Sequence, residues 1–463
     1  MRETTRPAIY RTMKYWGKKP HNIWGNYIKE YCPKNGIVLD PFVGSGMTYF
    51  ESIKSNRNPI TIDINPISDI SIRCLTKRNI DINRLTSLTK KIINKISKEE
   101  YYVNEYKCKC DDCGKIVEIY NYKINGISTI TYKCDDCNKI VTKEIKDYKE
   151  TCYVINKWIP TKKLSDIESI SESFLKRINE DCIANLWTNR NLKILSEIYD
   201  MILNINDEDI KELLVFAFLQ CLHLTSKMCI PRNDKSNRPL STSWGRPAYM
   251  LSKKTFEQNP LLAFEKAVFN GTGILKALKS SEEYLGKQIK IQGKHLLGSS
   301  NEILDTFDKS MVDLVITDPP YGDLIQYGDL SEVWVSWLEH YNSLYKINHK
   351  KEIIINKNKA VDYYKNELKN TFLKINKVLK DDGFFILTFN SNKKEDWESL
   401  FYAIKNSNFK INKLILQKNM RSSEANVKAK EGIAISDYYL ICQKGNWTIE
   451  HIDKFLSNWR IDI

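Results

Sequence analysis

Short apolar runs separated by amphipathic stretches occur near the start of the chain and again in its last third. Residues 37–39 and 59–62 are strand-type runs, and the stretch between them, as far as Ile53, has helical spacing. Strand-type runs return at residues 289–291, 312–317, 384–389, 413–417 and 437–442. Strands that alternate with helices predict a doubly wound α/β sheet, and the last two runs predict an antiparallel pair that closes a mixed sheet.

Between these two sets of strands the pattern changes twice. Residues 101–157 show β-type alternation and are rich in Cys, Tyr and Lys, whereas residues 160–285 have mainly helical signals, including 207–224. Because the sheet stops before residue 70 and resumes near residue 286, about 200 residues are inserted between its halves. We expect four units, which span residues 1–95, 96–157, 158–285 and 286–463.

The composition fits a globular protein with a polyanionic partner. Of the 463 residues, 42% are hydrophobic, which excludes wholesale disorder. Lys and Arg number 71 against 57 Asp and Glu, and the net charge of +14 favours nucleic acid as the partner. The chain is also crowded with Asn and Ile, which A/T-rich codons supply together with Lys, so codon usage accounts for part of the surplus.

No segment predicts secretion or membrane insertion. Residues 1–10 lack the apolar core of a signal peptide, and the most apolar run, 213–224, is too short to span a bilayer. We therefore expect a cytoplasmic protein with no membrane partner.

The first candidate site is a glycine-containing turn after the run at 37–39. Asp40 opens the string Asp-Pro-Phe-Val-Gly-Ser-Gly, which ends at Gly46, and Asp63 closes the next strand. Glycines at such a turn let a ligand approach the main chain, and a carboxylate after the following strand can bind ribose hydroxyls. The string lacks the third glycine of the dinucleotide fingerprint, so a nucleoside that carries a positive centre suits Asp40 better.

The second candidate site directly follows the run at 312–317 and reads Asp318-Pro319-Pro320-Tyr321-Gly322. The two prolines hold the chain extended with carbonyl groups facing outward, because neither can donate a hydrogen bond. A carboxylate, an exposed carbonyl and an aromatic ring at the end of a strand make a site for a flat ring that bears an amino group. The acid and the carbonyl would accept its N–H groups, and the tyrosine would stack on the ring.

Four cysteines predict a metal site in the cysteine-rich insert. They form two Cys-x-x-Cys pairs twenty residues apart, Cys110 with Cys113 and Cys134 with Cys137. Two such knuckles hold one tetrahedral Zn²⁺ through four thiolates, with Cys108 as a poorer alternative to Cys110. Four cysteine ligands leave no open position for water, so we expect the ion to be structural.

A basic loop within residues 231–254 is a candidate nucleic-acid contact. It contains Arg232, Lys235, Arg238 and Arg246, interleaved with Asn, Ser and Trp. These residue types contact phosphates and read base edges. A solvated loop in a Lys-rich chain is the alternative interpretation.

The two strings resemble motifs I and IV of the S-adenosylmethionine-dependent amino-methyltransferases, which modify adenine N6 or cytosine N4. Residues 15–22, Tyr-Trp-Gly-Lys-Lys-Pro-His-Asn, resemble motif X of that family, and residues 383–389 are similar to the strand that follows motif IV. Gly298-Ser299-Ser300 stands where relatives usually have Gly-Asp-Ala. More narrowly, the chain resembles bacterial adenine-specific methylases that carry a zinc ribbon.

This resemblance implies a Rossmann-like methyltransferase sheet in two parts, a cofactor-binding half (1–95) and a catalytic half (286–463). A zinc ribbon (96–157) and a mainly helical target-recognition region (158–285) lie between them. The resemblance further implies S-adenosylmethionine and structural zinc as cofactors and double-stranded DNA as partner, with a companion restriction endonuclease as an additional expectation. The implied catalytic residues are Asp318, Pro319, Pro320 and Tyr321. The implied cofactor-binding residues are Lys19, Pro20, Asp40, Pro41, Phe42, Gly44, Ser45, Gly46, Thr48, Asp63 and Ser299.

The implied reaction is methyl transfer to the N6 amino group of a flipped-out adenine, because Asp at the head of this string favours adenine in the family. Cytosine N4 is the nearest alternative. Guanine-N2 methyltransferases of RNA share a similar string, but they place only a short stretch between the two motifs, whereas a long insert separates Asp40 from Asp318 here. A zinc-ribbon DNA-binding protein on an inactive methyltransferase scaffold is a third alternative, and the intact residues of both strings argue against it.

Overall fold

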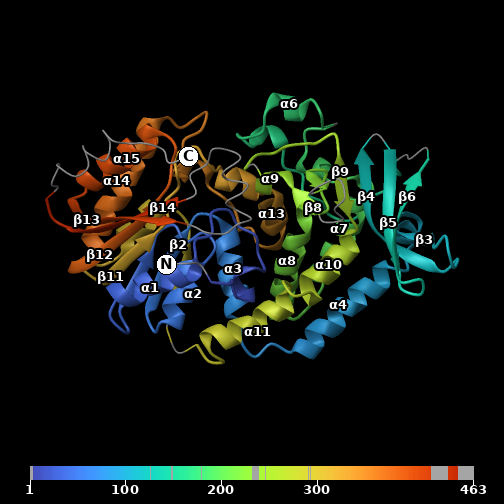
Figure 1. Cartoon of the computed structure of the whole chain (residues 1–463), viewed down its shortest axis with the longest axis horizontal. Coiled ribbons are helices and arrows are strands. Elements are labelled where there is room, and N and C mark those ends of the chain that lie inside the picture. The colour runs from blue at the N-terminus through green and yellow to red at the C-terminus, as the bar shows by residue number, and fades with distance from the viewer. Residues whose placement is uncertain are drawn as a thin grey trace.

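A mixed seven-stranded sheet occupies one end of the molecule in the computed structural model (Figure 1). The structure describes residues 4–125, 127–146, 150–178, 180–231, 239–245, 247–289, 291, 293–418 and 436–446. In spatial order the strands are β10 (Lys294–Leu297), β2 (Asn58–Asp63), β1 (Ile37–Asp40), β11 (Val312–Thr317), β12 (Leu379–Phe389), β14 (Ser436–Lys444) and β13 (Phe409–Lys418). The first five are parallel, and β14 runs antiparallel to both of its neighbours. The predicted doubly wound sheet and its antiparallel closing pair are confirmed.

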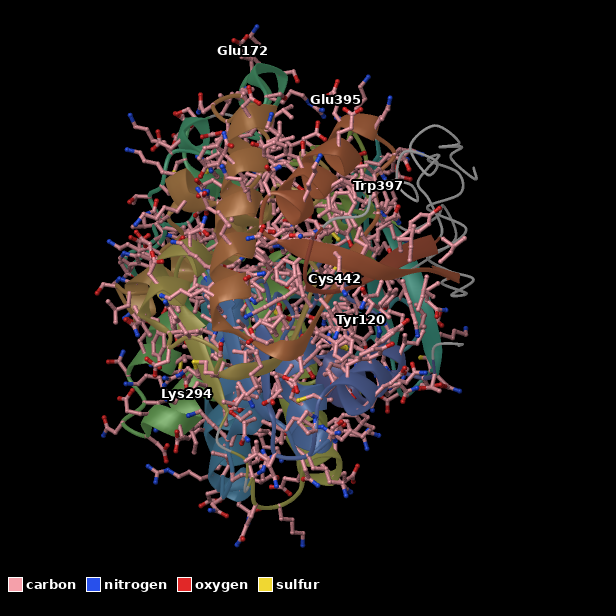
Figure 2. All side chains as sticks on the ribbon, turned by 90° about the vertical axis from the view of Figure 1, so that its left-hand side faces the viewer. Tyr120, Glu172, Lys294, Glu395, Trp397 and Cys442 are labelled. Atoms are coloured by element: carbon pink, nitrogen blue, oxygen red, sulfur yellow. The ribbon has the colours of Figure 1, made fainter. Side chains whose placement is uncertain are left out.

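Both faces of the sheet are covered by helices, which explains why its strands are apolar without strict alternation. In β14, Tyr439 and Ile441 belong to the hydrophobic cluster of one face and Leu440 and Cys442 to that of the other. The first face packs against α1 (His21–Tyr31), α2 (Met47–Lys54), α3 (Pro66–Thr76) and α13 (Tyr327–Tyr341). The second packs against α14 (Val361–Val378) and α15 (Lys394–Lys405), where Trp397 and Cys442, both buried, are labelled in Figure 2.

The helical insert continues the core of the first face. Its helices are α7 (Asn189–Leu203), α8 (Glu208–Leu222), α10 (Pro260–Phe269) and α11 (Ile274–Leu285), and α4 (Ile82–Ile96), which precedes the cysteine-rich insert, packs against α7 and α10. The apolar run at 213–224 falls largely in α8, whose residues from Leu213 to Leu219 are all buried, and α8 packs against α3 and α13. Because one hydrophobic cluster runs from the sheet through α8, the insert is anchored to the sheet by packing as well as by chain connections.

The cysteine-rich insert forms a small antiparallel sheet at the opposite end of the molecule (Figure 1). It consists of β3 (Lys107–Lys109), β4 (Ile116–Asn125), β5 (Ile127–Cys134) and β6 (Lys139–Ile145). The strand β9 (Thr255–Gln258) comes from the helical insert and pairs with β4. The two inserts therefore share a sheet.

The remaining elements are short. The helices are α5 (Glu100–Tyr106), α6 (Glu172–Leu175), α9 (Thr242–Gly245) and α12 (Ser300–Ile303), and β7 (Cys229–Pro231) pairs with β8 (Pro239–Ser241). Single 3-10 turns occur at Ala8–Tyr10, Leu164–Asp166, Ile183–Leu186, Leu304–Thr306 and His349–Lys351. Across the described residues, none of the helices combines the length and the apolar character that a bilayer crossing requires.

The strand predicted at residues 289–291 is wrong. The edge strand next to β2 is β10, which begins at Lys294. Neither Ile289 nor Ile291 belongs to a strand. Both isoleucines instead pack against the core of the first face. Their apolar character reflects this anchoring of a connecting segment, which a short periodic pattern does not distinguish from a strand.

Candidate active site

The turn after β1 depends on two glycines in the left-handed region. Gly44 has φ 52° and Gly46, which precedes the first residue of α2, has φ 81°. A Cβ on Gly46 would lie 2.9 Å from Phe50 and 3.0 Å from Ile72, so a side chain there would clash as well as strain the main chain. The turn therefore lets a ligand at the carboxyl end of β1 come close to the main chain, as expected from the sequence.

Asp40 ends β1 with its carboxylate buried beneath this turn. Its Oδ1 accepts hydrogen bonds from Thr317 Oγ1 at 2.6 Å and from Phe42 N at 3.0 Å, and its Oδ2 accepts one from Thr48 Oγ1. Burial raises the pKa of Asp40 to about 7, although these three donors oppose the shift. The carboxylate is thus held in place and would gain from a nearby positive charge.

Asp63 ends β2 beside the same turn. Gly44 N donates to its Oδ2 at 2.6 Å, and Asn65 N donates to its Oδ1 at 2.8 Å. Burial raises the pKa of Asp63 to about 6 despite these main-chain donors. The two carboxylates, which the sequence separates by a helix, therefore lie at adjacent strand ends.

A cleft with about 920 Å³ of open space lies at the carboxyl ends of β1, β2 and β11. This is the point where the strand order reverses direction, the usual ligand crevice of an open α/β sheet. Predicted residues that line it are Lys19, Asp40, Phe42, Gly44, Ser45, Thr48, Asp63, Ser299, Asp318 and Pro320. Pro20, Pro41, Gly46 and Pro319 are buried next to lining residues, and Tyr321 lies beside Lys19.

Asp318 directly follows β11 and lines the cleft, with its side chain 20% exposed. Three donors converge on its Oδ1: Thr388 Oγ1 at 2.6 Å, Lys19 Nζ at 3.2 Å and the Tyr321 hydroxyl. Burial raises the pKa of Asp318, and Lys19 opposes that shift. The acid is therefore fixed through one oxygen.

The two prolines and the tyrosine complete the turn after Asp318. The Pro320 carbonyl accepts a hydrogen bond from Tyr364 of α14 at 2.6 Å. The Tyr321 ring packs edge-on against Phe389 at the end of β12, with 4.9 Å between ring centroids. The turn is thus held from the second face of the sheet.

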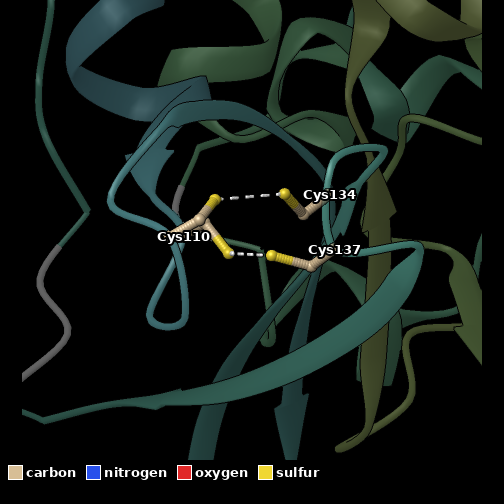
Figure 3. A group of neighbouring side chains, drawn as sticks. Cys110, Cys134 and Cys137 are labelled. Atoms are coloured by element: carbon tan, nitrogen blue, oxygen red, sulfur yellow. Dashed lines mark hydrogen bonds between the residues drawn. The ribbon is translucent and has the colours of Figure 1, made fainter.

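The four predicted zinc ligands converge at one end of the cysteine-rich insert (Figure 3). The Sγ atoms of Cys110, Cys113, Cys134 and Cys137 all lie within 4.8 Å of one another, and all four are free thiols. Cys110 Sγ is 3.9 Å from Cys137 Sγ, and Cys113 Sγ is 3.6 Å from Cys134 Sγ. A tetrahedral Zn²⁺ with Zn–S bonds of about 2.3 Å requires Sγ separations of about 3.8 Å, so the cluster fits that ion.

Comparison with known families relates the two strand-end sites to one family. The family model described as DNA methylase (N6_N4_Mtase) matches residues 3–71 and 312–459, which contain the Asp40–Asp63 and Asp318–Tyr321 sites respectively. These two segments are similar to DNA methylases. The name of that family covers both N6 and N4.

Other comparisons give distant similarities. No curated protein matches it. Among solved structures, TTHA0409 of Thermus thermophilus, described as a candidate DNA modification methylase, is 15% identical with a TM-score of 0.19; the match covers 33% of this chain and 53% of that one. PH0851 is 11% identical with a TM-score of 0.19 over 81% of this chain and 72% of that one. Phosphoethanolamine N-methyltransferase 2 of Haemonchus contortus is 10% identical with a TM-score of 0.18 over 96% of this chain and 100% of that one. TM-scores this low carry no argument here.

The residues of the cleft fit S-adenosylmethionine, the methyl donor that the matched family implies. Asp40 is a buried carboxylate whose raised pKa a sulfonium would lower, and the left-handed glycines keep side chains out of the turn. The donor set therefore suits a nucleoside with a positive centre.

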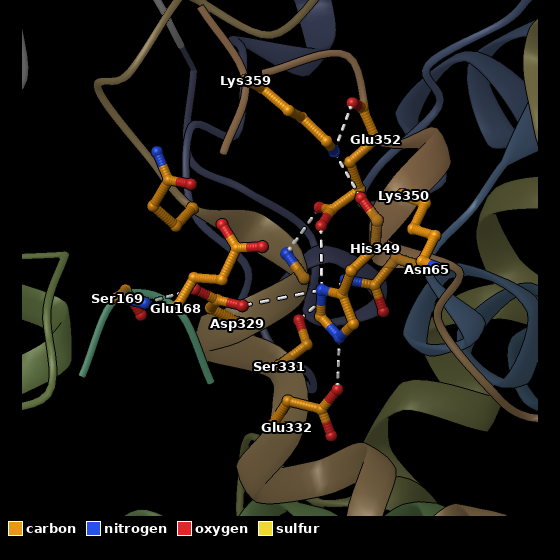
Figure 4. Close-up of polar contacts among 12 residues, drawn as sticks. Asn65, Glu168, Ser169, Asp329, Ser331, Glu332, His349, Lys350, Glu352 and Lys359 are labelled. Atoms are coloured by element: carbon orange, nitrogen blue, oxygen red, sulfur yellow. Dashed lines mark hydrogen bonds and ion pairs between the residues drawn. The ribbon is translucent and has the colours of Figure 1, made fainter. Parts of the chain in front are cut away.

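One wall of the cleft was not predicted from the sequence. It consists of Tyr327, which begins α13, and residues Lys351–Ile354. Glu352 in this wall belongs to a polar network around His349, which is drawn in Figure 4. No motif marks these residues, because the network rather than the local sequence brings them to the cleft.

The predicted DNA-contacting residues, Arg232, Lys235, Arg238 and Arg246, lie outside the described residues. Trp244 at the end of α9 is described, and the ammonium of Lys14 lies 4.0 Å from the centre of its ring. The neighbouring Trp16 donates from Nε1 to the Ser243 carbonyl at 2.8 Å. Trp16, which lines the cleft, is therefore in direct contact with α9, which belongs to residues 231–254 of the chain.

Proposed function

We propose that the chain transfers the methyl group of S-adenosylmethionine to the N6 amino group of adenine in double-stranded DNA. The observation that carries this proposal is the position of Asp318, with one oxygen fixed by three donors, in the same cleft as Asp40 and Asp63. An aspartate at the head of this motif supports adenine over cytosine by resemblance to the family.

The proposed role of Asp318 is to orient and activate the target amino group. Because Lys19, Thr388 and Tyr321 engage Oδ1, we assign Oδ2 to the amino hydrogen. The Pro320 carbonyl accepts from Tyr364, so we assign the Pro319 carbonyl to the second amino hydrogen. Two such bonds favour a tetrahedral nitrogen whose lone pair can attack, and Asp318 can take the proton that the methylated nitrogen releases.

The target base must leave the duplex to reach this site, since the amino nitrogen is otherwise stacked and paired. We propose that Tyr321 then stacks on the flipped base. Its ring must reorient to do so, and this breaks the hydrogen bond from the Tyr321 hydroxyl to Asp318. Phe389 packs edge-on against the Tyr321 ring and would limit how far that ring moves.

The cofactor supplies an electrophilic methyl group on a positively charged sulfur. We assign Asp40 to that charge, Asp63 to the ribose hydroxyls, and the turn from Phe42 to Gly46 to close main-chain contact. Thr48 and Pro41 hold this turn, through Asp40 and through Ser300 Oγ respectively. Ser299 lines the cleft beside Ser300.

Two further parts of the proposal concern the inserts. We propose that the four-cysteine cluster holds a structural zinc ion and that the basic loop, through Arg232, Lys235, Arg238 and Arg246, contacts the DNA backbone and base edges. A companion restriction endonuclease is part of the same expectation.

The test is methyl transfer from labelled S-adenosylmethionine to genomic DNA and, in parallel, to total RNA. The products are digested to nucleosides and identified by mass. We expect N6-methyladenine in DNA alone and, for Asp318→Ala, a loss of at least about 100-fold in rate with cofactor binding retained. N4-methylcytosine would overturn the base assignment, and label in RNA alone would overturn the DNA substrate.

A further inference from the structure

The ammonium of Lys19 is in direct contact with the carboxylate of Asp318. The resemblance to motif X implies a role in cofactor binding, yet Nζ of Lys19 lies 3.2 Å from Asp318 Oδ1 and donates to the Tyr321 hydroxyl at 2.7 Å. The side chain is 9% exposed. Its position is fixed at the main chain, where Arg6 donates to the Lys18 and Lys19 carbonyls and Pro20 precedes α1.

A second buried carboxylate shares this ammonium. Asp437, at the beginning of β14, has its Oδ1 3.4 Å from Lys19 Nζ and its side chain 5% exposed. Asn390, which follows β12, donates to the same oxygen at 3.3 Å. Because β14 is antiparallel to β12, its first residues reach the edge of the sheet where the parallel strands end.

The three charged groups form a buried cluster with two negative charges and one positive charge. Burial alone would lower the pKa of Lys19, but Asp318 and Asp437 outweigh it and raise that pKa. Without the ammonium, the carboxylates of Asp318 and Asp437 would lose the cation that they share, and this loss favours protonation of Asp318. A protonated Asp318 is a poor acceptor for an amino hydrogen.

We propose that Lys19 is a positioning residue for methyl transfer: it compensates Asp437 and keeps Asp318 ionised and fixed through Oδ1, so that Oδ2 faces the target amino group. This inference rests on the proposed function of Asp318 and adds two residues, Lys19 and Asp437, to the machinery that prepares it. It also removes Lys19 from the residues that bind the cofactor.

The two partners of Asp318 act on it in opposite directions. Lys19 lowers the pKa of Asp318 and Asp437 raises it. Among the described residues, the other titratable groups that face this acid are Tyr321 on its own turn, Tyr327 from α13 and Tyr439 from β14, all neutral at physiological pH because burial raises their pKa values. The acid limb of the pH–rate profile therefore reports the balance between Lys19 and Asp437.

The experiment compares Lys19→Met, Lys19→Arg, Asp437→Asn and the double variant Lys19→Met/Asp437→Asn in the full chain. For each, kcat is measured against pH and the dissociation constant of S-adenosylmethionine is measured by calorimetry. Lys29→Met, which removes an exposed lysine of α1, is the matched control. Thermal unfolding confirms that each variant is folded.

We expect the acid limb to move up by about one pH unit or more in Lys19→Met and down in Asp437→Asn, with the double variant nearer to wild type than Lys19→Met. Lys19→Arg should keep the limb near that of wild type. The cofactor dissociation constant of Lys19→Met should stay within about twofold, because Lys19 does not hold the cofactor.

Two results would overturn the inference. One is that the acid limbs of the pH–rate profiles of Lys19→Met and Asp437→Asn stay in place or move in the same direction. The other is a rise of about tenfold or more in the cofactor dissociation constant of Lys19→Met, which would return Lys19 to the cofactor site. The binding measurement requires no turnover, so it tests the role of Lys19 even if the wild-type chain methylates a base other than adenine or none at all. The product of the wild-type chain tests the proposed function separately.

Discussion

At the scale of single residues, the charge of Asp40 depends on what occupies the cleft. Burial raises the pKa of Asp40 to about 7, so the group is largely neutral at lower pH and ionised at higher pH. A sulfonium carries a fixed positive charge and is attracted only to the ionised form. The affinity for S-adenosylmethionine should therefore increase with pH through neutrality, by roughly tenfold between about pH 5.5 and about pH 8.5.

Calorimetric titration against pH checks this expectation. S-adenosylhomocysteine shares every part of the cofactor except the methyl group and the positive charge it places on sulfur, so its affinity should change much less over the same range. In Asp40→Asn, which retains one oxygen acceptor for either Thr48 or Thr317 and carries no charge, the two ligands should lose their difference in pH dependence. Parallel curves for both ligands in the wild-type chain would contradict the assignment of Asp40 to the sulfonium.

Residues next to a recognisable strand end could be predicted from the sequence, and residues brought in from elsewhere could not. Asp40, Asp63 and Asp318 each follow an apolar run, and the structure brings all three to one cleft. Asp437 follows no motif, although the strand it begins was predicted. Its importance comes from Lys19, near the other end of the chain, and local patterns carry no information about such a contact.

At the scale of elements, a charged network joins α13 to the segment that forms one cleft wall (Figure 4). His349 Nε2 lies 2.6 Å from Glu332 Oε1 of α13, and Nδ1 lies 3.0 Å from Glu352 Oε2. Glu352 Oε1 also accepts a hydrogen bond from Gly328 N at 2.9 Å. The protonated imidazole thereby ties the wall residues 351–354 to the helix that carries Tyr327.

This network predicts a pH-dependent contribution to stability. Burial alone would lower the pKa of His349, but Glu332 and Glu352 raise it from 6.5 to about 10. A raised pKa means stabilisation that is complete below the unfolded pKa and is lost as pH rises through the folded pKa. His349→Gln should therefore lower the free energy of unfolding by about 2–4 kcal/mol near pH 6, with the gap closing toward about pH 10.

Urea denaturation of both proteins across this pH range provides the measurement. His340→Gln is the matched control, because His340 lies on the same helix as Glu332 and stacks on Trp158 instead of pairing with a carboxylate. Burial lowers the pKa of His340, so its gap should be flat above neutral pH. A His349→Gln gap that does not change with pH would argue that the network is neutral.

Elements were predictable where length and flanking residues agree with the periodic pattern. The antiparallel pair β13 and β14 and the buried helix α8 follow from their apolar runs. The run at residues 289–291 has a similar local pattern but anchors a connecting segment, because the partner strand β2 pairs instead with Lys294–Leu297. Pairing is decided across the sheet, which a three-residue pattern does not record.

At the scale of the whole molecule, the cysteine-rich insert is fastened to the helical insert by buried contacts. Arg190 of α7 pairs with Glu257 of β9 at 3.0 Å, and its guanidinium lies 3.8 Å from the centre of the Tyr122 ring of β4. Both charged side chains are at most 2% exposed. The ribbon is therefore held against the helical insert as well as by its own chain connections, consistent with a structural zinc site.

At the four-cysteine end of the ribbon, the charges between the cysteines are paired. The four aspartates between the cysteines pair with four lysines, Asp111 with Lys143, Asp112 with Lys139, Asp135 with Lys133 and Asp136 with Lys115. Four thiolates around one Zn²⁺ would add about two negative charges. These four paired lysines should therefore contribute little to the attraction of DNA phosphates.

The salt dependence of DNA binding distinguishes the ribbon from the basic loop. Each phosphate contact contributes about 0.9 to the slope of log K against log salt concentration, so Arg232→Ala/Arg238→Ala should reduce that slope by about 2. Lys115→Met/Lys139→Met removes the same number of positive charges from the zinc end and should leave the slope unchanged, because both lysines are already paired with aspartates. Fluorescence anisotropy with a labelled duplex at several salt concentrations measures both slopes. If the ribbon variant lowers the slope and the loop variant does not, the DNA lies against the zinc ribbon, and the basic loop is a solvated surface segment.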